Sequence, residues 1–359
     1  MLWGASAKKH LAQLDAESDN LHAALVWALG QAGAEPALAM GAALGWYWPI
    51  RHRYVDAVEW IARALSLPGA DAHPALCVRA LCIKAWALWP LGRGAEQRTV
   101  MAEAEAIARA LADPVILSQV LQTRAAHEGT AGRLEVAGTL ADEALFCASA
   151  AGDGWAIAMA AFARAMAVKS VTELRERVDR AASLLDEVGN VHRLADMLAS
   201  AAYQALCIGS DLDAKDFLNR AVPIVHGLDD PLLRMLLRGN LALAALLTGE
   251  TDDARETIGD ELRLSREFVI LPFASEGLGG LAAVAVVHDD VHRAARLAGA
   301  AAAHRYGQPE DAVDARLEAT FFTPARARCT ADAWHATARE GAALSFEDAI
   351  AYALEEPRA

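Results

Sequence analysis

The sequence predicts an all-α protein, a superhelix of about seven antiparallel helical hairpins with a linker helix before the hairpins and a helical cap after them. Three observations predict it: an alanine-rich composition, breaks that recur at a nearly constant spacing, and small residues in a constant register. Hydrophobic residues make up 55% of the 359 residues and aromatic residues only 6%, and β-branched residues are sparse. This composition favours helix over strand.

Breaks in the helical pattern recur at intervals of about 40 residues. They lie near His52, Arg93, Gly132, Ser170, Ser210, Glu250 and Asp289. A second set of helix-ending signals, such as Pro68-Gly69 and Asp113-Pro114, falls between these breaks. Two segments of helical length in each period indicate stacked hairpins rather than one globular core.

Small residues keep a constant register in the predicted second helix of several hairpins. Pairs of alanines seven residues apart occur at Ala57 and Ala64, Ala137 and Ala144, Ala214 and Ala221, and Ala294 and Ala301. Residues two turns apart share one helix face, and small side chains there let a neighbouring helix approach closely. The register therefore predicts tight antiparallel hairpins over residues 35–308.

Residues 1–34 lie before the repeats and are predicted to form a linker and capping helix. The stretch LDAESDNLHAALVWAL, from Leu14 to Leu29, starts with acidic residues and is amphipathic. The face that can pack on the first hairpin carries Leu21, Ala24, Leu25, Ala28 and Leu29. The opposite face carries Asp19, His22 and Trp27.

Residues 309–359 are predicted to form a C-terminal helical cap. They include AWHATAREGAALSFEDAIAYALEE, from Ala333 to Glu356. Within it, Ser345 followed three residues later by Asp348 is typical of a helix start with side-chain capping.

The repeats resemble a known family. In the first hairpin Leu44-Gly45, Tyr54, Ala57, Ile61, Ala64 and Pro68 stand at the spacings of the tetratricopeptide consensus. A period near 40 resembles the longer variant found in the superhelical sensor domains of large bacterial transcription activators. The segments from Leu14 to Leu29 and from Ala333 to Glu356 are similar to the linker helix and the closing helices of multidomain LuxR- and AfsR-type regulators. In those regulators a nucleotide-binding ATPase of the STAND class precedes a tetratricopeptide-like superhelix.

The resemblance implies a right-handed superhelix that senses a ligand or a protein in a bacterial transcriptional regulator. Its partners would be an upstream ATPase domain or another protein, and a small-molecule inducer; Asp19, His22 and Trp27 would contact the upstream domain. The sequence has no GxxxxGK[ST] pattern and no basic recognition helix, so the ATPase and DNA-binding parts are expected to be missing from this chain. A stand-alone scaffold for protein–protein interaction stays open as the alternative.

Several side chains are candidates for ligand binding. They are Trp46, Trp86, Trp89, Gln119, Gln122, Arg164 and Tyr203. At 100° per residue Trp48 shares an arc with core residues, whereas Trp46 points the opposite way. A large aromatic side chain there can pack on a neighbouring repeat or line a groove that suits an aromatic, sugar or peptide ligand. Both glutamines lie opposite the apolar arc of their helix.

No sequence pattern indicates an enzyme or a cofactor site. HDDVH, from His288 to His292, offers four possible metal ligands, but it lies at a break where an Asp can cap the next helix. Without a third His or Cys at ligand spacing, capping is favoured over a metal site. GLGG, from Gly277 to Gly280, lies inside a predicted helix, so close helix packing is favoured over a phosphate-binding loop.

The charge and the cysteine usage of the sequence narrow the possible partners and the cellular compartment of the protein. The net charge is −14 and the basic residues are scattered singly, so direct contact with nucleic acid is not expected. Five cysteines without paired spacing, and no signal peptide, indicate reduced thiols in the cytoplasm. The longest apolar uncharged run, Pro36 to Ile50, is shorter than the roughly 20 residues that span a membrane.

Overall fold

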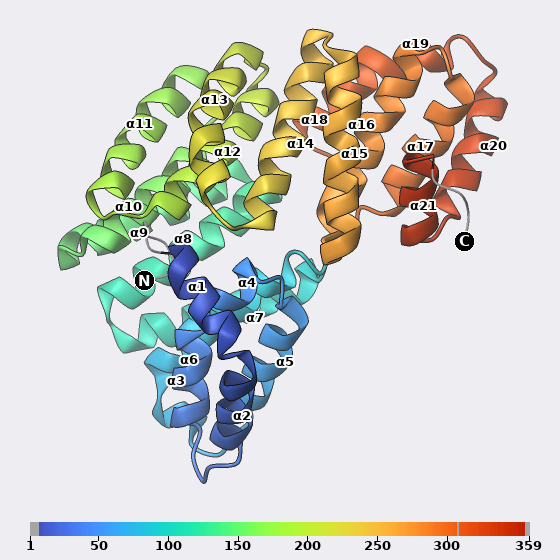
Figure 1. Cartoon of the computed structure of the whole chain (residues 1–359). Coiled ribbons are helices and arrows are strands. Elements are labelled where there is room, and N and C mark those ends of the chain that lie inside the picture. The colour runs from blue at the N-terminus through green and yellow to red at the C-terminus, as the bar shows by residue number, and fades with distance from the viewer. Residues whose placement is uncertain (1–6, 307–308, 356–359) are drawn as a thin grey trace. The chain divides into compact units, whose positions relative to one another are not determined.

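The computed structural model describes residues 7–306 and 309–355, and every regular element within them is a helix. The chain divides into two compact units. Unit 1 comprises Met1–Met197 with Ile224–Asp230, and unit 2 comprises Leu198–Pro223 with Pro231–Ala359. The all-α fold predicted from composition and periodicity is confirmed (Figure 1).

Residues 35–303 form seven antiparallel hairpins, the predicted number. The first helices are α3 (Glu35–Ala43) with the short α4 (Tyr47–Ile50), α6 (Pro74–Leu88), α8 (Pro114–Thr130), α10 (Gly154–Ala165), α12 (Val191–Ile208), α14 (Pro231–Thr248) and α16 (Leu271–Val287). The second helices are α5 (Tyr54–Leu65), α7 (Gly94–Leu111), α9 (Leu134–Ala151), α11 (Val171–Glu187), α13 (Asp211–Gly227), α15 (Thr251–Phe268) and α17 (Val291–Ala303). The second helices start 40 residues apart, except for one shorter step between α9 and α11, so the predicted period is confirmed.

The alanine register marks where the helices of a hairpin approach each other. The eight paired alanines of α5, α9, α13 and α17 are all buried. First helices also contact the first helices of adjacent hairpins, as α6 contacts α8 and α14 contacts α16. Gly277 and Gly280 on α16 extend this close packing, since a Cβ at either position would lie 2.8 Å from a side-chain carbon of α15. The interpretation of GLGG as a packing feature is therefore confirmed.

The N-terminal segment differs from the single helix predicted over Leu14 to Leu29. It is divided at Glu17 into α1 (Ala7–Ala16) and α2 (Ser18–Leu29). Asp15, at the end of α1, accepts hydrogen bonds from the Tyr47 hydroxyl at 3.1 Å and from the Arg51 guanidinium at 2.7 Å. Such an anchor favours a bend at Glu17 because it fixes α1 to the first hairpin separately from α2.

Helix α2 packs as its amphipathic pattern predicts. Leu25 and Ala28 are buried, and α2 contacts α3. On the opposite face Asp19 and His22 are exposed, and Trp27 is 61% exposed. The predicted role of this face in contacting another domain stays a prediction.

After the hairpins the chain continues through short helices. They are α18 (Ala312–Leu317), a π-helical turn (Glu318–Phe322), α19 (Thr323–Arg326), α20 (Ala331–Ala342) and α21 (Phe346–Ala353). Ser345 caps α21 by accepting the Asp348 N–H at 3.1 Å, as predicted. Helix α20 crosses α17 at Gly299 and Gly341, where an added Cβ would lie 1.9 Å or less from a carbonyl oxygen of the other helix. Residues 307–308, at the end of the predicted repeat region, and residues 356–359, at the end of the predicted cap, lie outside the described residues.

One described helix, α14, is long and apolar enough to cross a membrane by length and composition. Of its 18-residue window, 56% is buried inside the protein. The core helix of a folded domain has the same composition, so α14 is weak evidence for a membrane span.

Candidate functional site

Arg193, on the first turn of α12, lies between two tryptophans of unit 1. Its guanidinium carbon is 4.1 Å from the ring centroid of Trp46, which follows α3, and 5.5 Å from that of Trp86, on α6. Both distances fall within the range of a cation–π contact. We call Trp46, Trp86, His127, Arg193 and Asp196 the Trp–Arg cluster.

Local structure fixes the position of Arg193. Asn190 caps α12, and its side-chain oxygen accepts the Arg193 N–H at 3.0 Å. One turn along the helix, Asp196 forms an ion pair with the Arg193 guanidinium. Arg193 is 6% exposed, and its Nε has no hydrogen-bond partner among the described residues. The cluster thus holds a buried cation with one hydrogen-bond donor to spare, and such a donor favours an added acceptor.

His127, on α8, completes the aromatic wall. Its ring packs edge-on against Trp86, with 5.2 Å between centroids. Neither ring nitrogen has a hydrogen-bond partner in the described part of the chain. Burial lowers the pKa of His127 to about 4 because the charged imidazolium loses its hydration. The imidazole is therefore neutral at pH 7, so it offers one donor and one acceptor beside Trp86.

A set of polar contacts explains why residues so distant in sequence meet. Arg51, after α4, bonds Asp15 of α1 at 2.7 Å and Asp229 at 3.3 Å. His192, next to Arg193, lies 2.6 Å from a carboxylate oxygen of the buried Asp230. These contacts hold the start of α12 and residues 224–230 in the same unit as the first hairpin.

The structure brings together two of the seven predicted ligand-binding residues, Trp46 and Trp86. Trp89 is partly buried on the turn after α6. Gln119 and Gln122 are partly buried on α8, and the Gln122 side-chain oxygen has no hydrogen-bond partner among the described residues. Whether any of them binds a ligand stays a prediction.

Arg164 and Tyr203 belong to other contacts. The Arg164 guanidinium pairs with Asp142 of α9 and donates to the Ala167 carbonyl at 3.1 Å, so it joins the helices α9 and α10. Tyr203 lies in unit 2, where its hydroxyl donates to Asp311. Arg193 and Asp196 were not among the predicted residues. An i, i+3 ion pair on a helix is no signal for a binding site, and the two tryptophans that Arg193 contacts lie more than 100 residues away.

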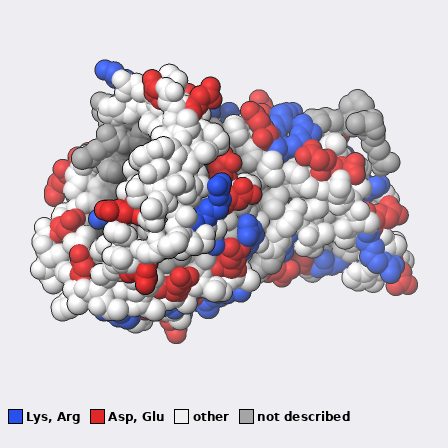
Figure 2. Space-filling model, turned by 90° about the horizontal axis from the view of Figure 1, so that it is seen from below, with Lys and Arg blue, Asp and Glu red and all other residues white. Residues whose placement is uncertain are grey.

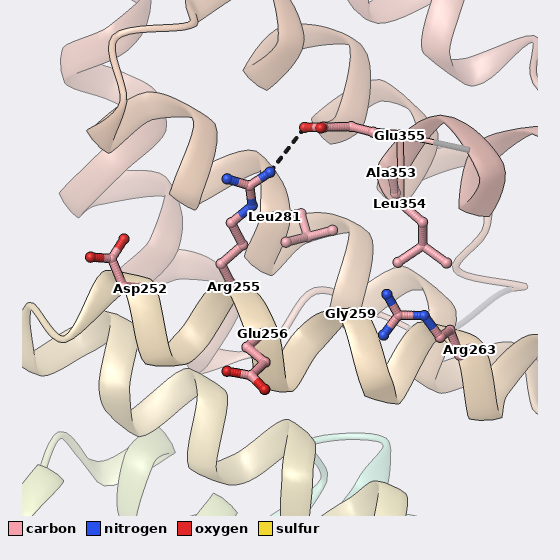
Figure 3. Close-up of a pocket in the computed structure, with 9 residues that line it drawn as sticks. All are labelled: Asp252, Arg255, Glu256, Gly259, Arg263, Leu281, Ala353, Leu354 and Glu355. Atoms are coloured by element: carbon pink, nitrogen blue, oxygen red, sulfur yellow. Dashed lines mark hydrogen bonds and ion pairs between the residues drawn. The ribbon is translucent and has the colours of Figure 1, made fainter. Parts of the chain in front are cut away.

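Unit 2 has a groove of about 290 Å³ between α15, α16 and the end of α21 (Figure 3). Arg255 reaches across to Glu355 at 3.1 Å, and Leu281 and Leu354 supply apolar surface. Arg263 lines the groove beside Leu354. Two guanidinium groups and three carboxylates line the groove, so charges of both signs are mixed there and no single sign dominates it.

The HDDVH segment acts as a helix start. Asp290 caps α17 by accepting the Arg293 N–H at 2.9 Å, which confirms the capping interpretation. Asp289 forms an ion pair with Arg328 at 2.6 Å. Within residues 7–306 and 309–355, no group of three or more His, Cys, Asp or Glu side chains is arranged to hold a metal ion.

On the face shown in Figure 2, Lys and Arg are interspersed with Asp and Glu, and neither sign forms a continuous patch. Elsewhere in the described residues charged side chains join the two helices of a hairpin, as Lys84 does with Glu96 at 3.1 Å and Arg238 with Asp260. Ion pairs of this kind give these surface charges a role in holding helices together.

Comparisons with known proteins identify no relative: no protein-family model matches this chain, and no curated protein matches its sequence. The grounds for a functional proposal are therefore the fold, the exposed face of α2 and the Trp–Arg cluster.

Proposed function

We propose that this chain is a ligand- or protein-binding regulatory domain of a bacterial transcriptional regulator, and that the Trp–Arg cluster is its binding site. The observation that carries the proposal is the placement of Arg193 between Trp46 and Trp86. Aromatic faces beside a buried cation and a neutral imidazole supply both apolar area and hydrogen-bonding groups. This combination suits a small aromatic or sugar ligand, or one side chain of a peptide.

Ligand binding at the cluster would change contacts of the N-terminal helices. A ligand that stacks on Trp46 or Trp86 competes with Arg193 and so weakens the hold of α12 on the first hairpin. Arg51 bonds both Asp15 of α1 and Asp229 at the same end of unit 1. The occupied cluster would thereby shift α1 and α2, whose exposed residues Asp19, His22 and Trp27 are the proposed contact for an upstream ATPase domain.

A thermal-shift panel of sugars, nucleotides, aromatic metabolites and short peptides tests this proposal. A compound that binds the folded state raises the melting temperature. We expect at least one class to do so, with the shift lost in Trp86→Leu and kept in Phe146→Ala. Phe146 is a matched aromatic control because it is 75% exposed on α9. Turnover of ATP by the purified chain, or a shift that Trp86→Leu leaves intact, would contradict the proposal.

A scaffold for protein–protein interaction is the second candidate. The observation that favours it is the exposed apolar surface of α2, where Val26 is 50% and Trp27 61% exposed. The scaffold would be favoured if no compound of the panel raises the melting temperature and the chain binds a defined protein partner. Trp27→Glu should then abolish this binding, and Phe146→Ala should not.

A further inference from the structure

Three carboxylates gather in unit 2 where the segment after the last hairpin meets α16. They are Glu276 of α16, and Asp311 and Asp314 at the start of α18. Asp314 pairs with Arg305 at 2.8 Å, and Asp311 accepts the Val313 N–H at 2.9 Å and the Tyr203 hydroxyl. These two aspartates are therefore satisfied by the fold. No described cation pairs with the partly buried Glu276.

A fourth carboxyl group, that of Glu261, lies close to Glu276. Glu261 of α15 is 1% exposed, and its Oε1 has no hydrogen-bond partner among the described residues. An unpaired buried carboxyl oxygen costs folding free energy unless a donor reaches it. The buried, unpartnered oxygen of Glu261 is a feature beyond the gathering of acidic residues, and it favours a hydrogen-bond donor at this place.

Gly239 on α14 shows how close the two glutamates come. A Cβ at this position would lie 2.7 Å from Glu261 Oε1 and 3.0 Å from Glu276 Oε1. The two oxygens are therefore less than about 6 Å apart, because both lie that close to one point. Any side chain at position 239 would overlap the carboxyl groups, so glycine is what lets both of them approach α14 and each other here.

The surroundings disfavour two negative charges. The titratable groups facing the pair are Tyr203, Cys207, Asp311 and Asp314. Burial, followed by the charges of Asp311 and Asp314, raises the pKa of Glu276 to about 8. Burial and the charge of Glu276 raise the pKa of Glu261 well above its usual value. A cation between the two carboxylates would lower the pKa of both groups.

The geometry allows one kind of cation. A charge-assisted N–H···O bond is about 2.8 Å long, so one tetrahedral ammonium nitrogen can bond two oxygens that lie about 4 to 5 Å apart, a separation within the upper limit of about 6 Å set by Gly239. Ca²⁺ needs six to eight oxygen ligands, and no described group of three or more side chains is arranged for a metal ion. Glu276 is only partly buried, which gives a ligand access to the pair.

We propose that Glu261 and Glu276 form a binding site for the primary ammonium group of an organic amine. The ammonium donates one hydrogen bond to a carboxyl oxygen of each residue. One proton leaves the pair to solvent as the amine binds and the other stays, so the single negative charge of the pair balances the single positive charge of the ammonium. This site is separate from the Trp–Arg cluster and does not depend on the function proposed for that cluster.

Isothermal titration of the whole chain with n-butylammonium at pH 7 and pH 8 tests the proposal. We expect saturable binding with proton release, seen as a binding enthalpy that depends on the ionisation enthalpy of the buffer. Tetramethylammonium carries the same charge but has no N–H donor, so we expect no binding. Equal heats from the two cations would overturn the proposal, since they would indicate a general charge effect.

Amide variants locate the site. Glu261→Gln and Glu276→Gln keep the side-chain size, and we expect each to weaken butylammonium binding at least tenfold. Glu256→Gln on the same helix α15 is the matched control because Glu256 is exposed, and it should bind as the unaltered chain does. Undiminished binding by Glu261→Gln would refute the assignment.

Infrared difference spectra of the unaltered chain decide the matter if a variant does not fold. The band of protonated carboxyl groups must lose intensity when butylammonium is added, and an unchanged band counts against the site.

Discussion

The guanidinium carbon of Arg193 lies 4.1 Å from the ring centroid of Trp46, so the fifth hairpin of the chain contacts the first. In a simple stack of hairpins, each repeat contacts only its neighbours. Here Arg193 and the Arg51–Asp229 ion pair join elements separated by three hairpins, all within unit 1. Unit 1 is therefore stabilised by long-range contacts in addition to the contacts between adjacent repeats.

Replacing Arg193 should destabilise unit 1. Arg193→Ala removes the cation–π contacts and leaves Asp196 without its partner, at an expected cost of about 2 to 3 kcal/mol in the free energy of unfolding. Urea unfolding followed by tryptophan fluorescence measures this loss, because every tryptophan except Trp334 lies in unit 1. Arg63→Ala is the control, since Arg63 also lies over an aromatic ring of unit 1, that of Trp60, but is exposed. Equal losses from the two substitutions would contradict the structural role of Arg193.

His127 should make unit 1 less stable in acid. The pKa of His127 is lowered to about 4 in the folded chain, whereas an unfolded histidine takes up its proton near pH 6.5. The unfolded state thus binds more protons between these two values, and stability falls as the pH drops from about 6.5 toward 4. The slope contributed by His127 is up to about 1.4 kcal/mol per pH unit. Urea unfolding at several pH values should show this slope, and His127→Phe should remove it; an identical slope in both proteins would be evidence against a neutral buried imidazole.

Glu276 should have the opposite effect on unit 2. Its pKa is raised to about 8, so the folded chain keeps a proton that the unfolded chain releases near pH 4.5. Stability is full below pH 4.5 and is lost as the pH rises toward 8, by up to about 1.4 kcal/mol per pH unit. Glu276→Gln should remove this loss and leave unit 2 more stable than the unaltered protein at pH 8. Hydrogen exchange of α14, α15 and α16 measures the difference, and faster exchange in the variant at pH 8 would contradict the assignment.

The crossing of α17 and α20 should tolerate no side chain. A Cβ at Gly299 would lie 1.9 Å from the Ala338 carbonyl oxygen, so Gly299→Ala must push α20 away, at an expected cost of about 3 kcal/mol. Gly279→Ala on α16 is the control, because its nearest contact would be 4.0 Å away and alanine is the better helix former. Thermal unfolding by circular dichroism compares the two, and a Gly299→Ala protein as stable as the control would show that the helices do not approach this closely.

The repeats could be predicted from sequence because their signals are local. The period, the buried pairs such as Ala214 and Ala221, and the caps at Asp290 and Ser345 all depend on residues close together in the chain. The bend at Glu17 could not be predicted in this way, because the anchor of α1 is Arg51, 36 residues from Asp15.

The candidate site was only half predictable. Helical periodicity turned Trp46 away from the core arc of Trp48, and the structure has Trp48 buried and Trp46 against Arg193. The partner was missed because no repeat rule brings α12 to the first hairpin. The approach of Glu261 to Glu276 was missed for a related reason: the two residues lie on different helices, and the contact of both carboxyl groups with Gly239 of a third helix is a tertiary feature that no local pattern shows.

Hydrogen exchange with and without the compound that raises the melting temperature in the panel tests the central claim most directly. If the chain binds its ligand at the Trp–Arg cluster, the amides of α6, α8 and the start of α12 gain protection, those of α1 change as well, and Trp86→Leu abolishes all of these changes. Protection confined to the second helices α7, α9 and α11, or protection that persists in Trp86→Leu, would contradict the account.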